Sequence, residues 1–195
     1  DNHEDKRQYL NELTTSYLYK DILEIGNVRY PQKIRQLLKL LSYQIGNLIA
    51  IQELANTLQI NRETVLHYID LLEKSFVIFR LGAFSRNLRK EITTKDKIYF
   101  YDLGIRNALI ENYSPIDVRP DLGAMWENFL LTERKKKMEY ARMYPGMYFW
   151  RTYTGSELDY VEENDGVLSG YEIKWQSKSV RQPQSWKETY GDNAW

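Results

Sequence analysis

The sequence predicts an α+β (mixed α/β) protein, with a mainly helical part followed by a smaller α/β part. Two observations lead to this prediction. Apolar residues recur at spacings of three and four through most of residues 6–74, which is the pattern of amphipathic helices. From residue 122 onward, one more helical stretch is followed by three short runs of β-branched and aromatic residues, so a helix and then three strands are expected.

The first two helices are predicted from apolar periodicity and from their end signals. Residues 6–25 carry one apolar stripe and lead to Gly26. Pro31 suits the first turn of a second helix, which ends near Gly46. The stripe of this second helix is formed by Ile34, Leu37, Leu38, Leu41 and Ile45.

Residues 49–74 predict a helix-turn-helix. In the first of these helices Leu54, Ala55 and Leu58 share one face, and Asn61 is placed to cap the second helix. The inner stripe of the second helix is formed by Val65, Tyr68, Ile69 and Leu72. Two apolar runs follow, at 76–81 and 97–101, and they are expected to form the strands of a wing. Residues 31–110 are therefore predicted to be a winged helix domain.

A winged helix that binds DNA inserts the start of its second helix into the major groove, and basic residues of the wing contact phosphates. The residues that match these positions are Arg62, Thr64 and His67 on the helix and Arg86, Arg89 and Lys90 in the wing loop. The alternative is a domain that only contacts protein, because Glu63 would face the phosphates and such domains also serve as rigid contact modules. Both alternatives stay open.

Composition narrows the function classes further. No run approaches the roughly 20 consecutive apolar residues that span a bilayer, so we expect a soluble, cytoplasmic protein with no membrane partner. The sequence has no cysteine and two histidines, which argues against zinc fingers and nucleophilic triads and leaves oxygen-bound hard cations as the metals to expect. Basic and acidic residues are equal in number, 27 each, so no net charge steers the whole molecule toward DNA.

The segment from 111 to 121 contains Pro115 and Pro120 and is the expected boundary of a second domain at 111–195. The helix predicted at 122–138 carries Glu127 within its apolar face.

Two runs near the end of the chain carry acids on expected strands, 155–161 and 170–175. Glu172 and Lys174 would share a face about 6.6 Å apart, because side chains alternate along a strand. If the strands are neighbours, Asp159 and Glu172 can bind one Mg²⁺ (or Mn²⁺), with Lys174 beside the water or phosphate. Glu-x-Lys also occurs at 4–6 and 133–135, so only the strand setting gives this copy weight. The alternative is an ordinary hairpin with solvated charges.

The order of Glu127 on a helix, Asp159 on the second strand and Glu172-Ile173-Lys174 on the third resembles the PD-(D/E)XK nuclease superfamily. The resemblance implies a restriction-endonuclease-like α/β fold, here without its last strand. It also implies a role for each residue: Asp159, Glu172 and the Ile173 carbonyl would bind the metal, Glu127 would orient a water, and Lys174 would stabilise the attacking hydroxide.

A longer set of motifs covers nearly the whole chain: Tyr17-Leu-Tyr-Lys-Asp21, Leu54-Ala55, Lys97-Ile-Tyr-Phe-Tyr-Asp102-Leu-Gly104 and Gly123-x-x-x-Glu127-Asn128-Phe129. It is similar to the C-terminal domain of unknown function that follows the ATPase module in AAA+-type P-loop ATPases of bacteria and archaea. The resemblance implies an N-terminal ATPase module as partner, with residues 1–30 as the linker helix that joins this module to the rest of the chain. ATP is expected on that module only, because this sequence has no Gly-x-x-x-x-Gly-Lys-Ser/Thr motif. We therefore expect an excised C-terminal fragment without ATPase activity.

The function expected from the sequence combines a DNA- or protein-binding winged helix with a magnesium-dependent phosphodiesterase site. The alternative is a non-catalytic adaptor or assembly domain that has kept only the nuclease fold. The sequence leaves the oligomeric state open.

Overall fold

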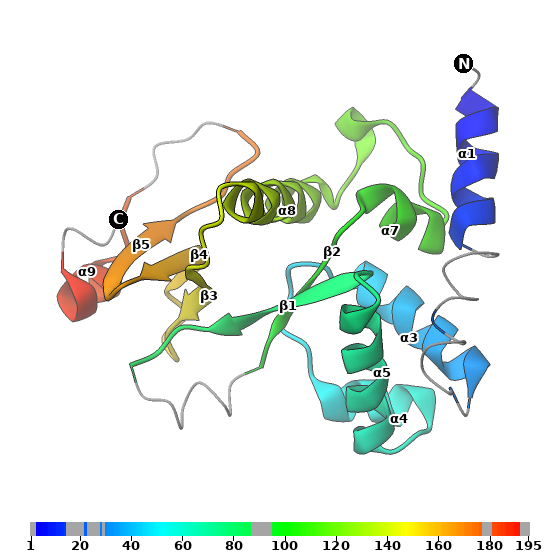
Figure 1. Cartoon of the computed structure of the whole chain (residues 1–195), viewed down its shortest axis with the longest axis horizontal. Coiled ribbons are helices and arrows are strands. Elements are labelled where there is room, and N and C mark those ends of the chain that lie inside the picture. Colours follow the sequence, from blue (N-terminus) through cyan, green and yellow to red (C-terminus); the bar gives the residue numbers. More distant parts are fainter. Residues whose placement is uncertain are drawn as a thin grey trace. The chain divides into compact units, whose positions relative to one another are not determined.

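The computed structural model describes residues 3–14, 22, 28, 30–86, 95–176 and 181–191, with side chains from residue 5 onward (Figure 1). It shows an α+β protein whose five strands form one mixed sheet in the order β2-β1-β3-β4-β5. The chain divides into two compact units, Asp1–Arg80 with Ile98–Arg119, and Leu81–Lys97 with Pro120–Trp195. None of the described helices combines the length and apolarity needed to cross a membrane.

The elements that lie wholly in the first unit are helical. They are α1 (His3–Glu12), α3 (Pro31–Tyr43), α4 (Ile51–Leu58), α5 (Arg62–Lys74), α7 (Leu103–Leu109) and the short 3₁₀ helix η2 (Ile116–Val118). Two strands run across the division between the units, β1 (Ile78–Ala83) and β2 (Lys97–Phe100). The second unit also contains α8 (Leu122–Tyr140), β3 (Gly146–Arg151), β4 (Glu157–Asn164), β5 (Val167–Tyr171) and α9 (Gln184–Tyr190).

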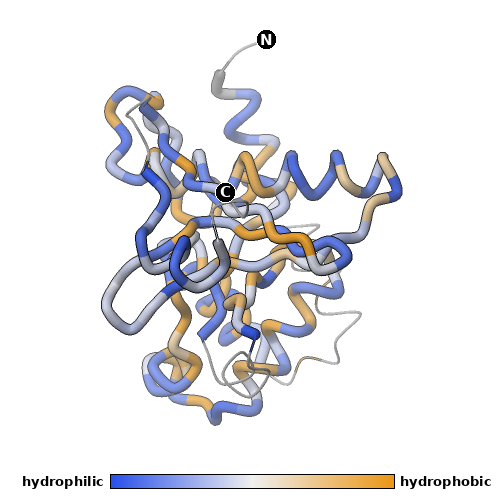
Figure 2. The backbone as a smooth tube through the Cα atoms, turned by 90° about the vertical axis from the view of Figure 1, so that its left-hand side faces the viewer, coloured by the Kyte–Doolittle hydropathy of each residue, from blue (hydrophilic) through white to orange (hydrophobic). Residues whose placement is uncertain are grey.

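The helices of the first unit form where the apolar pattern predicts them. Pro31 occupies the first turn of α3, and the predicted stripe from Ile34 to Ile45 is buried. Figure 2 shows both hydrophobic and hydrophilic residues along the helical coils of the backbone, as helices with one apolar packing face require. Of the helix predicted at 6–25, α1 supplies the first part, and most of 15–29 lies outside the described residues.

The helix-turn-helix pair is confirmed as two helices with a tight turn. Gln59 adopts a left-handed conformation with φ of 53° and ends α4. The Asn61 side chain accepts a hydrogen bond from the Thr64 backbone N–H at 2.7 Å and so caps α5. The first unit is tied together further by Arg106 of α7, a buried side chain whose Nε donates to the Ser42 carbonyl of α3 at 2.7 Å.

The sheet of the second unit mixes parallel and antiparallel pairing. The end of β1 runs parallel to β3, with Gly82 opposite Tyr148 and Ala83 opposite Phe149. Both β3–β4 and β4–β5 are antiparallel. The sequence predicts that β1 belongs to a separate wing of the first domain. Instead β1 continues past Arg80 and pairs with β3, and residues 81–97 group with the second unit. The second domain was expected to begin at residue 111, and the division between the two units lies between Arg119 and Pro120.

A β-bulge interrupts the pairing of β3 with β4. The partners on either side of it are Tyr148 with Val161 and Trp150 with Leu158. In the strand pairing, Phe149 of β3 is therefore opposite two residues of β4, Asp159 and Tyr160. A bulge of this kind reverses the alternation of side chains between the two faces of the sheet. Leu158 and Val161 consequently lie on the same face although they are three residues apart.

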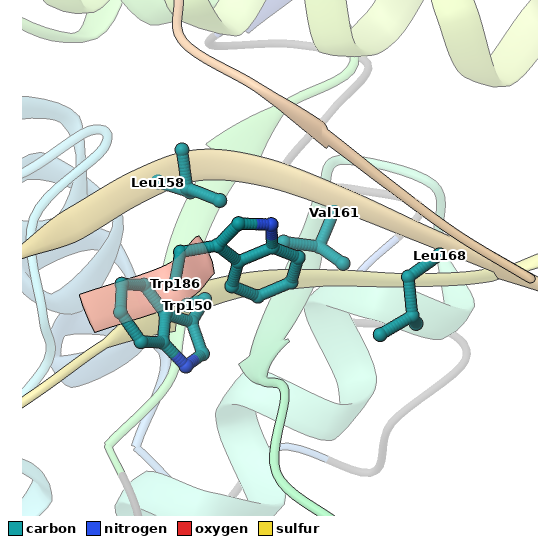
Figure 3. Close-up of a cluster of buried hydrophobic side chains, with 5 residues drawn as sticks. All are labelled: Trp150, Leu158, Val161, Leu168 and Trp186. Atoms are coloured by element: carbon teal, nitrogen blue, oxygen red, sulfur yellow. The ribbon is translucent and has the colours of Figure 1, made fainter. Parts of the chain in front are cut away.

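The apolar core of the second unit lies on that face, under α9. It consists of Trp150, Leu158, Val161, Leu168 and Trp186. Figure 3 shows the indole rings of Trp150 and Trp186 beside each other, in edge-to-face contact with 5.1 Å between ring centroids. The Trp186 side chain is fully buried, so α9 is held to the sheet by its largest apolar residue.

The opposite face of β4 is contacted by α8. Glu127, Leu131, Arg134 and Met138 form one stripe of α8 at helical spacing. Arg134 makes a bidentate ion pair with Glu162, the neighbour of Val161 on β4. Because adjacent strand residues point to opposite faces, α8 and α9 cover opposite faces of the sheet.

We predict that Arg134→Met lowers the free energy of unfolding by about 2–4 kcal/mol, because Glu162 then remains largely buried without its cation. Lys136→Met on the same helix is the matched control, since its pair with Glu133 is exposed, and about 0.5 kcal/mol or less is expected. Urea unfolding followed by circular dichroism measures both. Equal losses in the two variants would contradict the structural role of the Arg134–Glu162 pair.

The same pair predicts a pH dependence. Burial raises the pKa of the Glu162 carboxyl, but Arg134, through its hydrogen bonds and its charge, and Tyr160 together outweigh burial and hold this pKa below its usual value of 4.5. The pair therefore stabilises the wild type fully above that value, and this contribution is lost as the pH falls through the lowered pKa. Acid titration of stability should show a smaller loss in Arg134→Met than in the wild type.

Candidate functional site

Four carboxylates and two lysines gather within the second unit. They come from β2, α8, β4 and the segment after β5. The carboxylates are Glu127, Glu157, Asp159 and Glu172, and the lysines are Lys97 and Lys174. Each lysine contacts two of the carboxylates, so the cluster consists of two halves with one ammonium group each.

The first half is built around Lys174. Its Nζ pairs closely with Glu172 and lies 3.9 Å from Oδ2 of Asp159. The same Oδ2 accepts the backbone N–H of Ile173 at 2.7 Å. The Lys174 side chain is 51% exposed, so this ammonium group can reach solvent.

The second half is built around Lys97, the first residue of β2. Its Nζ lies 2.7 Å from Oε1 of Glu157 and 3.4 Å from Oε1 of Glu127. It also lies 5.4 Å from the centre of the Phe149 ring. The Lys97 side chain is only 4% exposed, in contrast to Lys174.

The charges of the two halves act on each other. Burial opposes the charge on Lys97, but Glu127, Glu157 and Asp159 together outweigh burial and raise the pKa of this lysine. The hydrogen bond to Glu172 raises the pKa of Lys174, with smaller contributions from Asp159 and Glu127. Asp159 and Glu127 thus influence both lysines, and the cluster behaves as one electrostatic unit.

The bulge in β4 explains how Asp159 reaches the segment after β5. The β4–β5 ladder ends where Tyr160 pairs with Tyr171. Ile173 has left the strand, and its N–H is bound by the Asp159 carboxylate instead of by a backbone carbonyl. The expected strand at 170–175 is therefore wrong in its extent: β5 ends at Tyr171, and Glu172 and Lys174 share a site without lying on a strand.

The structure places all four predicted catalytic residues, Glu127, Asp159, Glu172 and Lys174, within this cluster. Ile173 takes part through its N–H. Two members were not predicted as site residues, Glu157 and Lys97. Glu157 could have been found, because it lies two residues before Asp159 on the expected strand and its side chain would therefore point to the same face. Lys97 is the first residue of the apolar strand β2, thirty residues before Glu127 in the sequence, and no local pattern marks it as a site residue.

The residues predicted to contact nucleic acid lie in both units. Arg62 and His67 are exposed on α5, and Thr64 is half-buried. Arg86 lies 5.3 Å from the ring centre of Tyr190 in the second unit. Arg89 and Lys90 lie outside the described residues. A cavity of about 510 Å³ beside the start of α5 is lined by Tyr30, Lys33, Gln59, Ile60, Asn61, Thr64, His67 and Tyr68.

A magnesium ion suits part of the cluster. Asp159 and Glu172 both lie near the ammonium group of Lys174, so two carboxylate side chains face the same cation. Mg²⁺ is commonly held by one or two carboxylates and completed by water, so this pair of donors fits the ion. Nowhere in the described ranges do three acidic or histidine side chains together form a group that could hold a metal.

We predict that Asp159→Ala releases the segment after β5, because the Ile173 N–H loses a charged acceptor. Such a hydrogen bond contributes about 1.5–3 kcal/mol, so exchange of the Ile173 amide should accelerate by roughly 10- to 100-fold. Asp159→Asn keeps an acceptor oxygen and should stay within about tenfold of the wild type. Hydrogen exchange measured by NMR tests this, and unchanged protection in Asp159→Ala would refute the contact.

Comparisons with known proteins agree with a two-part chain. The family described as "Domain of unknown function (DUF4143)" matches residues 122–194. An uncharacterized protein of Mycobacterium tuberculosis is 31% identical over 176 residues, which is 88% of this chain and 38% of that protein. An uncharacterized protein of Methanocaldococcus jannaschii is 27% identical over 68% of this chain and 29% of its own length. No solved structure matches significantly.

The chain therefore spans well under half of the length of these relatives. The family described as "Domain of unknown function (DUF8612)" matches residues 1–115, which include the helix-turn-helix pair and β2 with Lys97. Because this match covers more than half of the sequence, the chain belongs to the DUF8612 family.

Proposed function

We propose that this chain is the C-terminal region of an AAA+-type ATPase, and that it joins a winged-helix nucleic-acid-binding unit to a magnesium-dependent phosphodiesterase unit. The observation that carries the second part is the convergence of Asp159, Glu172 and Lys174 in one cluster with Glu127. The ATPase part rests on the motif resemblance. The length that the relatives have beyond the matched region leaves room for such a module.

Each residue has a distinct task in this proposal. Asp159 and Glu172, with the Ile173 carbonyl, hold the ion, and the N–H of Ile173 keeps Asp159 in place. When bound, Mg²⁺ polarises the phosphate and lowers the pKa of a coordinated water. Lys174 stabilises the charge that develops on the phosphate oxygens, and Glu127 orients the attacking water.

The reaction is hydrolysis of a phosphodiester. The water oxygen forms a new bond to phosphorus, and the bond between phosphorus and the 3′ oxygen of the sugar breaks. The attacking water releases a proton to solvent, and the leaving 3′ oxygen takes a proton from solvent. The products carry a 5′-phosphate and a 3′-hydroxyl.

Aromatic side chains next to the cluster support a nucleic acid substrate. Trp126 precedes Glu127, Trp175 follows Lys174, and their rings meet edge to face with 5.2 Å between centroids. Trp175 and Phe129 are each 44% exposed. Exposed rings beside a phosphate-binding cation are typical of sites that stack nucleobases.

The alternative function is a non-catalytic adaptor or assembly domain. One observation favours it: within the described part of the chain, each carboxylate of the cluster is already bound by a lysine or a backbone N–H. Such a cluster is balanced without a metal ion. The two functions differ in whether an ion enters.

Cleavage of supercoiled plasmid in Mg²⁺ or Mn²⁺ tests the enzymatic proposal. The wild type should nick the plasmid, and Asp159→Asn and Lys174→Ala should each lose about 100-fold or more, because each removes charge stabilisation at the phosphate. Lys136→Ala on α8 is the matched surface control and should keep wild-type activity. The same background in all samples would remove catalysis and leave the adaptor function.

DNA binding by the first unit is tested separately. Arg62→Ala should weaken binding to duplex DNA, and the slope of log K against log salt should decrease by about one, because one phosphate contact is lost. Lys74→Ala at the other end of α5 is the control, since this exposed lysine pairs with Asp70. Equal effects of the two substitutions would contradict DNA contact through the start of α5.

A further inference from the structure

The two halves of the carboxylate cluster differ in how firmly their ammonium groups are held. Lys174 is half-exposed, whereas Lys97 is almost fully buried and lies within ion-pair distance of two carboxylates. Two-metal phosphodiesterases place their ions about 3.5–4 Å apart among shared carboxylates. In this chain Lys97 supplies a positive charge where the second half of the cluster requires one.

We propose that Lys97 is a built-in counter-cation that takes the place of a second metal ion. The cluster then accepts one divalent ion, at Asp159 and Glu172, and excludes another from Glu127 and Glu157. This inference rests on the proposed metal-binding function of the first half. It adds that the stoichiometry of the site is set by a lysine from β2.

The contacts of Lys97 support this role. Its Nζ lies 2.7 Å from Glu157 and 3.4 Å from Glu127, so it occupies the space between their carboxylates. The aliphatic stem is covered and the ammonium group lies over the Phe149 ring, so the group cannot turn outward as Lys174 can. An ammonium group in that position repels a second divalent ion by charge and by volume.

Removing Lys97 should reverse this exclusion. Lys97→Met keeps most of the length of the side chain and removes its charge, which leaves Glu127 and Glu157 without their counter-cation. Two carboxylates that repel each other favour a bound cation. The variant should therefore bind one more divalent ion than the wild type and should gain thermal stability when Mn²⁺ is added.

The test is calorimetric titration of Mn²⁺ into the whole chain, with no nucleic acid present. We expect about one ion per wild-type chain, about two for Lys97→Met, and about one for Lys97→Arg, which keeps the charge. Lys136→Met, which removes an exposed lysine next to a glutamate on α8, should also leave one ion. One ion bound to folded Lys97→Met would overturn the inference.

A second variant keeps the inference testable if Lys97→Met does not fold. Glu157→Gln should keep the wild-type Mn²⁺ stoichiometry and affinity within about threefold, because Glu157 serves Lys97 and not the ion, whereas Asp159→Asn should abolish binding. Loss of binding in Glu157→Gln would make Glu157 a metal ligand and refute the inference. Two ions on the wild type would refute the inference alone, while no ion would refute the proposed metal site as well.

Discussion

The balance between four carboxylates and two ammonium groups is the constraint on which the second unit depends. Carboxylates from α8, β4 and the segment after β5 approach each other only because Lys97 and Lys174 lie among them. An isolated buried charge is strongly unfavourable, whereas a paired and hydrogen-bonded one is tolerated. The second unit therefore requires a residue of β2, although the rest of that strand belongs to the first unit.

This division places Lys97 at a junction in the chain. Lys97 is the last residue of its segment in the second unit, and Ile98 opens the next segment of the first. The residues that follow it, Ile98, Tyr99 and Phe100, are all buried. The ammonium group of Lys97 is held by the charges of Glu127 and Glu157. The region that matches the DUF8612 family, residues 1–115, therefore contributes Lys97 to the cluster.

Sequence patterns predicted the elements that depend on local interactions. Asn61 caps α5 as expected, and Asp102 caps α7 in the same way, because both contacts join residues three positions apart. The predicted Asp159, Glu172 and Lys174 also meet, since an antiparallel hairpin brings its two arms together. In these cases the sequence distance is short or a turn closes it.

Long-range features could not be predicted in the same way. Lys97 meets Glu127 thirty residues away, and nothing in either segment encodes that contact. The end of β5 at Tyr171 was also missed, because β-branched and aromatic residues continue past it at Ile173 and Trp175. At that point the Asp159 side chain accepts the Ile173 N–H in place of a backbone carbonyl, and strand propensities do not describe such a long-range contact.

The bulge in β4 connects these observations. With regular alternation Asp159 and Val161 would share a face, and either the charged cluster or the apolar core would lose a member. The extra residue lets Leu158 and Val161 both pack with Trp186, while Asp159 and Glu162 point to the side of α8. Core packing on one face and charge pairing on the other are thus satisfied by one irregularity.

The difference between the two lysines then decides what the cluster can do. An ammonium group can give way to a metal ion only if it has a new place for its charge, and solvent offers that place to Lys174 but not to Lys97. Under the proposed function, the half around Lys174 can therefore exchange its cation for a metal ion, whereas the half around Lys97 keeps its lysine. A site with one exchangeable and one fixed positive charge can bind and release a ligand without losing the charge balance that holds the unit together.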